Sequence, residues 1–238
     1  MANLFTDGLS NPKTAKSDKA DRKFLTKILH LAPGKLSGRQ VCSSASAGCL
    51  AACLNTAGRG KMNTVQLARI RKTQMWFDFR AEFKTQIIKE LTAFVKRCEK
   101  LDCTAAIRMN GTSDILWETQ FSKLFTMFPM VQFYDYTKHV KRCLPGYALP
   151  SNYHLTFSRS ENNDAKCRQV LEGGLWNVVG VFDTKDFPST HWGYETYSAD
   201  EDDLRFLDPA GSHFGCLYAK GDAKKDESGF VIKLPVLT

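Results

Sequence analysis

A repeated alternation of short apolar segments and polar clusters limits this chain to a small set of folds. After residue 102, five apolar segments each end in polar or charged residues: AAIRMNGTSD, VQFYDYTK, YHLTFSRSE, NVVGVFDTKD and LRFLDPAG. They begin at residues 105, 131, 153, 177 and 204, so their starts lie 22 to 27 residues apart, with room between them for a short helix or loop. The most helix-like connecting stretch is LWETQFSKLFTMF. The spacing predicts an α/β protein built from βα units.

The region before residue 102 predicts one further strand and a long helix. The segment FLTKILHLAPG begins at Phe24 and closes with Pro33 and Gly34, as a strand followed by a turn does. Apolar residues then recur at helical spacing, which predicts one helix over 63–100, or two with a break near 74–78. Together these segments give about six strands. With 238 residues and 43% hydrophobic content, we expect a single α/β domain over 24–238 behind a flexible basic arm of residues 1–23.

Polar residues follow the predicted strands at the positions where βα proteins bind their ligands, the carboxyl ends of the strands. They are Asn110, Ser113, Asp114, Asp135, Lys138, Ser158, Asp183, Lys185 and Asp208. The same residue types also mark ordinary turns, which is the alternative for any single segment. Their recurrence after successive strands predicts a shared pocket.

Three cysteines stand close together between the first strand and the long helix, in VCSSASAGCLAACLNTAGRG. Cys42, Cys49 and Cys53 are separated by small residues, and the surrounding arginine and lysine residues favour the thiolate form that binds metals. Three thiolates predict a four-iron cluster with one iron left open. A zinc site and cysteines without metal remain the alternatives. The candidate fourth ligands are His30, His139, His154, His191, His213 and Cys216.

The amino-terminal sequence lacks the apolar stretch of a signal peptide, and no apolar run approaches the about 20 residues that cross a bilayer. We therefore expect a cytosolic protein with no membrane contact, whose eight cysteines do not form a disulfide framework. The scattered cysteines are interpreted as small apolar residues. They are Cys98, Cys103, Cys143, Cys167 and Cys216.

The net charge of +8 is unevenly distributed along the chain. Residues 1–100 hold 19 Lys and Arg against 7 Asp and Glu (+12), whereas residues 101–238 hold 14 against 18 (−4). The basic half contains the cysteine loop. Such a half can attract nucleic acid or another anionic partner, or it can be a solvated surface.

Several motifs resemble a family of bacteriophage proteins known as gene product eighty-eight. They are NPKTAKSDK, VCSSASAGCLAACLNTAGRG, ARIRKT, IRMNGTSDILWE, QFYDYTK, NYHLTFS and RFLDPAG. The resemblance covers nearly the whole chain from Asn11 onward. It implies a phage protein acting in the host cytoplasm, but the family brings no established activity.

The cysteine loop also resembles that of phage proteins related to radical S-adenosylmethionine enzymes. This second resemblance implies a partial βα barrel, a [4Fe-4S] cluster on the three cysteines, and S-adenosylmethionine on the fourth iron. Residues Arg108–Asp114 would then contact the amino group of the cofactor. The spacing of six and then three residues differs from the usual three and two, and Ala52 stands where an aromatic residue is usual. A protein side chain on the fourth iron is the alternative, which would make the cluster structural or electron-transferring.

Three hypotheses about function follow. The first is a radical S-adenosylmethionine-like enzyme with an unknown substrate, whose cofactor would contact Arg108, Asn110, Ser113, Asp114, Asp135, Lys138, Asn152, His154, Ser158, Asp183 and Lys185. The second is a nucleic-acid-binding protein or metal-dependent nuclease. It would use the cations Arg59, Lys61, Arg69, Arg71 and Lys72, the carboxylates Asp114, Asp135, Asp183 and Asp208, and the aromatic residues Trp76, Tyr134 and Tyr136. The third is a structural or host-interaction protein stabilised by zinc.

Overall fold

Six parallel strands follow one another across the sheet in chain order. The structure is a computed structural model that describes residues 3–8, 15 and 24–234. Its strands are β1 (Phe5–Asp7), β2 (Phe24–Leu29), β3 (Thr104–Arg108), β4 (Gln132–Thr137), β5 (Tyr153–Ser158), β6 (Val178–Phe182), β7 (Thr190–His191), β8 (Tyr194–Ser198), β9 (Phe214–Tyr218) and β10 (Val231–Ile232). The order β2-β3-β4-β5-β6-β9 is parallel throughout. The carboxyl ends of these strands therefore lie at one edge of the sheet, called here the carboxyl edge.

The remaining strands extend this parallel core. β8 pairs with β9 in parallel, while β1 and β7 pair antiparallel at the two ends of the path. β10 pairs in parallel with the last residues of β6, beyond the residues of β6 that pair with β5. Between β1 and β7 no pairing occurs within residues 3–8, 15 and 24–234, so the ten-stranded sheet is open.

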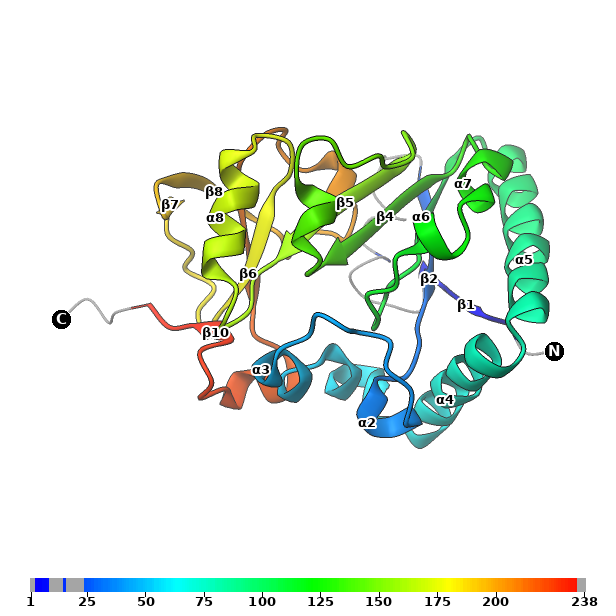
Figure 1. Cartoon of the computed structure of the whole chain (residues 1–238), viewed down its shortest axis with the longest axis horizontal. Coiled ribbons are helices and arrows are strands. Elements are labelled where there is room, and N and C mark those ends of the chain that lie inside the picture. Colours follow the sequence, from blue (N-terminus) through cyan, green and yellow to red (C-terminus); the bar gives the residue numbers. More distant parts are fainter. Residues whose placement is uncertain (1–2, 9–14, 16–23, 235–238) are drawn as a thin grey trace.

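The longer helices cover one face of the sheet (Figure 1). The α-helices are α2 (Gly34–Ser37), α3 (Ala47–Ala51), α4 (Asn63–Asp78), α5 (Arg80–Lys100), α6 (Trp117–Gln120), α7 (Lys123–Met127) and α8 (Asp164–Glu172). The 3-10 helices are η2 (Leu54–Thr56), η3 (Gly58–Lys61), η4 (Val140–Cys143), η5 (Arg205–Leu207) and η6 (Gly221–Lys225). The main core lies between this helical layer and the sheet, and it contains Phe83 and Leu91 of α5 and Phe133 and Leu155 of the strands.

Alternate residues of the strands face opposite sides, because successive side chains of a strand point to opposite faces. Ile107 and Phe133 pack in the main core, whereas Ala106 and Tyr134 pack on the other face against Leu204. The segment that carries η5 crosses this second face and contacts β4 and β5. Each face of the sheet is thus covered by a different part of the chain.

The predicted α/β class is confirmed, and five of the six predicted strands are β2, β3, β4, β5 and β6. The sixth prediction, LRFLDPAG, is wrong. Arg205–Leu207 form a 3-10 helix, and the true sixth parallel strand is Phe214–Tyr218. Apolar Leu204 is buried and Phe206 is partly buried, as a strand's residues would be, but they pack on the sheet rather than within it. The strand pairing establishes an open, mostly parallel sheet, which within the described residues does not close into a barrel.

The long helical region consists of two helices, α4 and α5, separated at Phe79. This confirms the second of the two alternatives, with the break directly after the predicted interval. The connecting stretch LWETQFSKLFTMF holds two short helices, α6 and α7.

The predicted arm of residues 1–23 contains a strand, so the expectation that order begins near Phe24 is wrong for residues 5–7. The amides of Leu4 and Phe5 donate to the Glu90 carboxylate at 2.7 and 3.0 Å, and both side chains are buried. The rest of the arm, 9–14 and 16–23, lies outside the described residues. Among the helices in the described ranges, none has the length and apolar character needed to cross a membrane.

Candidate functional site

The cysteine loop lies across the carboxyl edge. In Figure 1 the segment with α2 and α3 runs past the ends of β4 and β5 toward which the arrows point. Cys42 precedes α3, Cys49 lies within it, and Cys53 follows it. The position after the first parallel strand is the one that the sequence predicts.

All eight cysteines are free thiols, and the three of the loop are half-buried. Burial, together with the charges of Asp114, Cys53 and Cys49, raises the pKa of Cys42 to about 12. Burial and Cys49 likewise raise the pKa of Cys53. The three thiols are therefore near enough to repel one another as thiolates.

A network of polar contacts holds α3 in place. The Ser46 hydroxyl accepts from the Cys49 amide at 3.2 Å and donates to Glu161 at 2.6 Å. The Gly48 amide donates to the same carboxylate at 2.8 Å, and a Cβ at Gly48 would collide with Glu161 and Ser228. Although burial opposes it, these hydrogen bonds lower the pKa of Glu161. The charged carboxylate fixes the helix that carries Cys49.

The first part of the loop is fastened to the loop after β3. The Asp114 amide donates to the Val41 carbonyl at 2.8 Å, and the Cys42 sulfur lies 3.8 Å from the Thr112 carbonyl oxygen. Thr112 in turn donates its hydroxyl to the Leu31 carbonyl at 2.6 Å. The ends of β2 and β3 and the residues around Cys42 are thus one connected unit.

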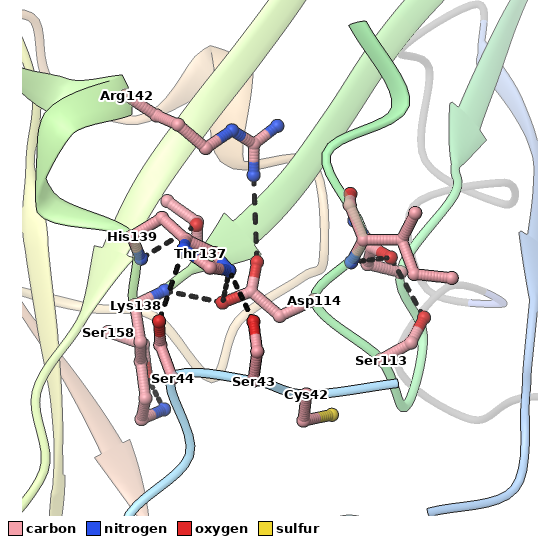
Figure 2. A network of polar contacts seen from close by, with 12 residues as sticks. Cys42, Ser43, Ser44, Ser113, Asp114, Thr137, Lys138, His139, Arg142 and Ser158 are labelled. Carbon is pink, nitrogen blue, oxygen red and sulfur yellow. Dashed lines mark hydrogen bonds and ion pairs between the residues drawn. The ribbon is translucent and has the colours of Figure 1, made fainter. Parts of the chain in front are cut away.

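The same part of the loop also reaches the end of β4, as Figure 2 shows. Ser43 and Ser44 contact the two ring nitrogens of His139 at 3.3 and 3.1 Å. Asp114 accepts from the Lys138 amide at 2.8 Å and lies 3.5 Å from the Arg142 guanidinium. These contacts place Asp114 and Lys138 beside Cys42, in agreement with their effects on the pKa of that thiol.

Two cations approach the thiols. Lys138 donates from Nζ to the Ser158 hydroxyl at 2.8 Å, and its charge lowers the pKa values of Cys42 and Cys53. Arg69 of α4 donates to the Asn55 side chain at 2.6 Å, and its charge also lowers the pKa of Cys53. The Asn55 backbone amide hydrogen-bonds the Cys53 thiol and acts in the same direction. Both cations oppose the burial that raises these pKa values.

The predicted residues Asp135, Asn110 and Ser113 form a buried network on the helix-covered side of the sheet. Asp135 lies within β4 rather than at its end, and it accepts from the Asn110 amide at 2.6 Å and the Tyr153 hydroxyl at 2.6 Å. The Asn110 side-chain oxygen accepts from Ser113, from the Ile115 amide and from Trp117. Burial raises the pKa of Asp135 to about 7, although these hydrogen bonds oppose the shift. The network shapes the loop after β3.

The other predicted cofactor residues are dispersed. Arg108 is buried and forms an ion pair with Asp203 at 3.1 Å. Asn152 lies before β5, at the opposite edge, and its amide donates to the carbonyls of Phe125, Phe128 and Val131. His154 lies early in β5, its ring edge against Trp176, and burial together with Arg205 lowers its pKa to about 4. Asn152 and His154 were predicted to contact the cofactor, but they lie at the start of β5, away from the carboxyl edge.

Asp183 and Lys185 follow β6 at the carboxyl edge but are exposed. The Asp183 amide donates to the Ile232 carbonyl at 3.2 Å, and Lys185 lies over the Tyr218 ring. Both residues therefore lie at the part of the carboxyl edge that is next to β10. Of the predicted cofactor residues, Asp114, Lys138 and Ser158 are the ones that the structure brings together next to a cysteine.

The residues of the nuclease hypothesis do not form one site. Within the described ranges, no group of three His, Cys, Asp or Glu side chains is assembled to hold a metal ion. Trp76 and Tyr134 are core residues, 3% and 0% exposed, so they cannot stack on bases. Arg59, Lys61 and Arg71 are exposed, whereas Arg69 and Lys72 are turned inward.

Sequence reasoning missed the support of the site. Glu161 lies 115 residues from Ser46, so no local pattern links them. In the segment NTAGRG, Gly60 is the residue that could have indicated a close approach of the chain. A Cβ at this position would lie 2.6 Å from the Asn55 carbonyl oxygen and 3.3 Å from Arg69. The scattered cysteines fit their interpretation: Cys98, Cys143, Cys167 and Cys216 are buried in the main core, and Cys103 packs against it.

Comparison with known proteins gives one match. A family model described as Gene product 88 matches residues 3–234. No curated protein and no solved structure matches the chain.

Proposed function

The chain belongs to the Gene product 88 family, and we propose that it is an iron–sulfur protein of the radical S-adenosylmethionine-like kind, acting in the host cytoplasm on a substrate still to be identified. Cys42, Cys49 and Cys53 would be the ligands of a four-iron cluster. One observation carries the proposal. A single fastened loop holds three mutually coupled thiols at the carboxyl edge of six parallel strands.

The number of cysteines, rather than their geometry, favours a cluster over a zinc ion. Three thiolates can bind three irons of a four-iron cluster and leave the fourth iron open, whereas a structural zinc ion needs a fourth protein ligand. In the described part of the chain no three potential ligands are already grouped around a metal position, so either metal would have to draw the thiols together.

The surroundings of the thiols fit such a ligand. Cluster binding requires thiolates, and the buried thiols must release their protons to form them. Arg69 and Lys138 favour that release through their charges, and the Asn55 amide hydrogen-bonds the Cys53 sulfur. When bound, the cluster would supply one-electron transfer. The chain's own residues hold the ligands through the contacts of α3 and of the loop after β3, and they place polar groups beside the thiols.

The nucleoside cofactor of the proposal would meet Asp114, Lys138 and Ser158. These side chains lie beside Cys42 and present a carboxylate, an ammonium group and a hydroxyl. A zwitterionic ligand that carries ribose hydroxyls has matching donors and acceptors. The sequential order of the parallel strands is also the order that a partial βα barrel would have.

Anaerobic purification tests the metal. We expect a brown protein with absorption at about 400 nm that contains iron and sulfide. A colourless protein containing zinc would refute the cluster and support the zinc-stabilised alternative.

Addition of S-adenosylmethionine tests the enzyme. With the reduced, iron-loaded protein, we expect the paramagnetic resonance spectrum to change and 5′-deoxyadenosine to form. An intact cluster whose spectrum does not respond would leave a structural or electron-transfer cluster and would refute the radical-enzyme part of the proposal.

A further inference from the structure

Four nitrogen-bearing side chains lie close together near the cysteine loop, at the carboxyl ends of β2 and β3. We call His30, Arg69, Lys72 and Arg108 the cationic cluster. Arg69 and Lys72 come from α4, His30 follows β2, and Arg108 ends β3. Arg69 connects this cluster with Cys53 through its effect on the pKa of that thiol.

Strand register brings His30 and Arg108 to the same face. Ile28 of β2 is paired with Arg108 of β3, and His30 follows Ile28 by two residues. In parallel strands paired residues share a face, and so do residues two apart. The His30 ring packs directly on Gly111, where a Cβ would collide with the ring nitrogen Nδ1. A glycine at position 111 therefore lets the ring lie against the loop after β3.

Several nitrogens of the cationic cluster are buried without a hydrogen-bond partner among the described residues. They are His30 Nδ1, Arg69 Nε and Arg108 Nε. Arg69 and Arg108 are only 8% and 9% exposed, and their Nη1 nitrogens donate to Asn55 and Asp203, respectively. Buried polar groups without partners destabilise a fold, and where they persist they call for a ligand or ordered water.

The electrostatics point to an anion. Burial lowers the pKa of His30 well below its usual value, and the charges of Arg69, Arg108 and Lys72 lower it further. Only Asp203 acts in the opposite direction among the groups that shift it. Burial also lowers the pKa of Lys72 to about 8, against the attraction of Glu90. Three cations thus act on His30, while Asp203 acts on His30 and Arg108, and Glu90 acts on Lys72.

We infer that the cationic cluster binds an oxyanion group, a carboxylate or a phosphate, of a small ligand held beside the three cysteines. Guanidinium groups pair with such groups through two parallel hydrogen bonds, which would occupy the free Nε atoms. The burial of both arginines suits a small molecule better than a polymer backbone. The inference deepens the proposed function, because it names the chemistry of a ligand next to the cysteines. The geometry that supports it involves no metal.

Titration with inorganic phosphate tests the site in the full-length, reduced, metal-free protein. Phosphate should shift the imidazole resonances of His30 and raise the melting temperature. Arg69→Met and Lys72→Met should each weaken phosphate binding by about tenfold or more, the usual effect of losing a hydrogen bond to a charged group. Arg71→Met is the matched control, because Arg71 is the exposed neighbour of Lys72 on the same helix.

The possible results of the phosphate titration lead to different conclusions. If phosphate leaves the His30 resonances unchanged, or if Arg71→Met weakens binding as much as Lys72→Met, the site is refuted, and ordered water fills the space. Lys72→Met keeps the test decisive should Arg69→Met fail to fold. If S-adenosylmethionine competes with phosphate, the bound anionic group is the carboxylate of that cofactor. If it does not compete, the anionic group belongs to a separate ligand. Iron content is measured separately, so a failure here leaves the cluster proposal standing.

Discussion

Two polar regions meet at the end of β3, and they differ in whether their buried polar atoms have hydrogen-bond partners. On the helix-covered side, Asp135 and Asn110 have partners for every side-chain polar atom. On the other side, His30, Arg69 and Arg108 each keep a buried nitrogen without a hydrogen-bond partner in the described residues. The first region is built to hold a loop, and the second is built for something that the chain itself does not supply. Strain and unpaired groups at one place, supported by a satisfied scaffold nearby, are typical of a ligand site.

The largest expected effect comes from breaking the satisfied region. Asn110→Ala should lower the free energy of unfolding by about 3 to 5 kcal/mol, because Ser113, Trp117 and the Ile115 amide lose a buried acceptor together. Chemical denaturation measures this. Ser113→Ala is the graded control and should cost only about 1 kcal/mol. Equal losses in the two variants would contradict the role given to Asn110.

Gly111→Ala should force the two regions apart. Its new methyl group collides with the His30 ring and with the Ile28 side chain, so we expect a loss of about 1 to 3 kcal/mol in the free energy of unfolding. The double variant with His30→Ala should recover the part of that loss that comes from the ring, which a double-mutant cycle would show as a coupling energy. Additive effects of the two substitutions would mean that the ring and the glycine do not touch.

The pH dependence of stability should have opposite signs in the two regions. The pKa of Asp135 is about 7 in the folded protein against an ordinary 3.8, so the folded state holds a proton that the unfolded chain releases. Stability should therefore fall as the pH rises between these values, by at most about 1.4 kcal/mol per pH unit. In the Asp135→Asn variant, stability should depend less on pH over this range.

His30 should act in the other direction. Its pKa in the folded protein is lowered below 6.5, so its contribution to stability is present above that pH and is lost as the pH falls. His30→Gln should remove this acid-side loss. Parallel denaturation curves at several pH values measure both effects, and the same change of slope in the two variants would refute the opposition.

The smallest expected effect is an increase in the free energy of unfolding. Lys72→Met removes one of three like charges around His30 and should stabilise the metal-free protein by up to about 1 kcal/mol. Arg71→Met, on the exposed side of the helix, should stay within about 0.5 kcal/mol of the wild type. A destabilised Lys72→Met variant would show that the lysine supports the fold rather than a ligand.

The sequence allowed the parallel strands and the cysteine loop to be predicted, because both depend on local patterns. β2 and β4 carry a clear apolar rhythm, and the loop follows β2 as expected. β9, Phe214–Tyr218, was missed, although in length and in its glycine it matches β6, which was predicted. Apolar Leu204 and Phe206 instead drew the prediction to a segment that covers the sheet.

The candidate site was less predictable because its parts come from distant segments. Asp114 and Lys138 follow strands in the expected way and do lie beside Cys42. Asp135 is of the expected residue type but faces the helices, since one residue of register decides the face of a strand. Glu161 and Arg69 reach the loop only through the folded chain, so spacing in the sequence carries no sign of their role.

The iron and sulfide content of a matched set of proteins, purified without oxygen, tests the central claim most directly. The wild type and Cys98→Ala should each hold about four iron and four sulfide per chain, because Cys98 is a core residue. Cys42→Ala, Cys49→Ala and Cys53→Ala should each lose most of both, since every one removes a third of the thiolate ligands. A wild type without iron and sulfide, or three loop variants that retain them in full, would contradict the account.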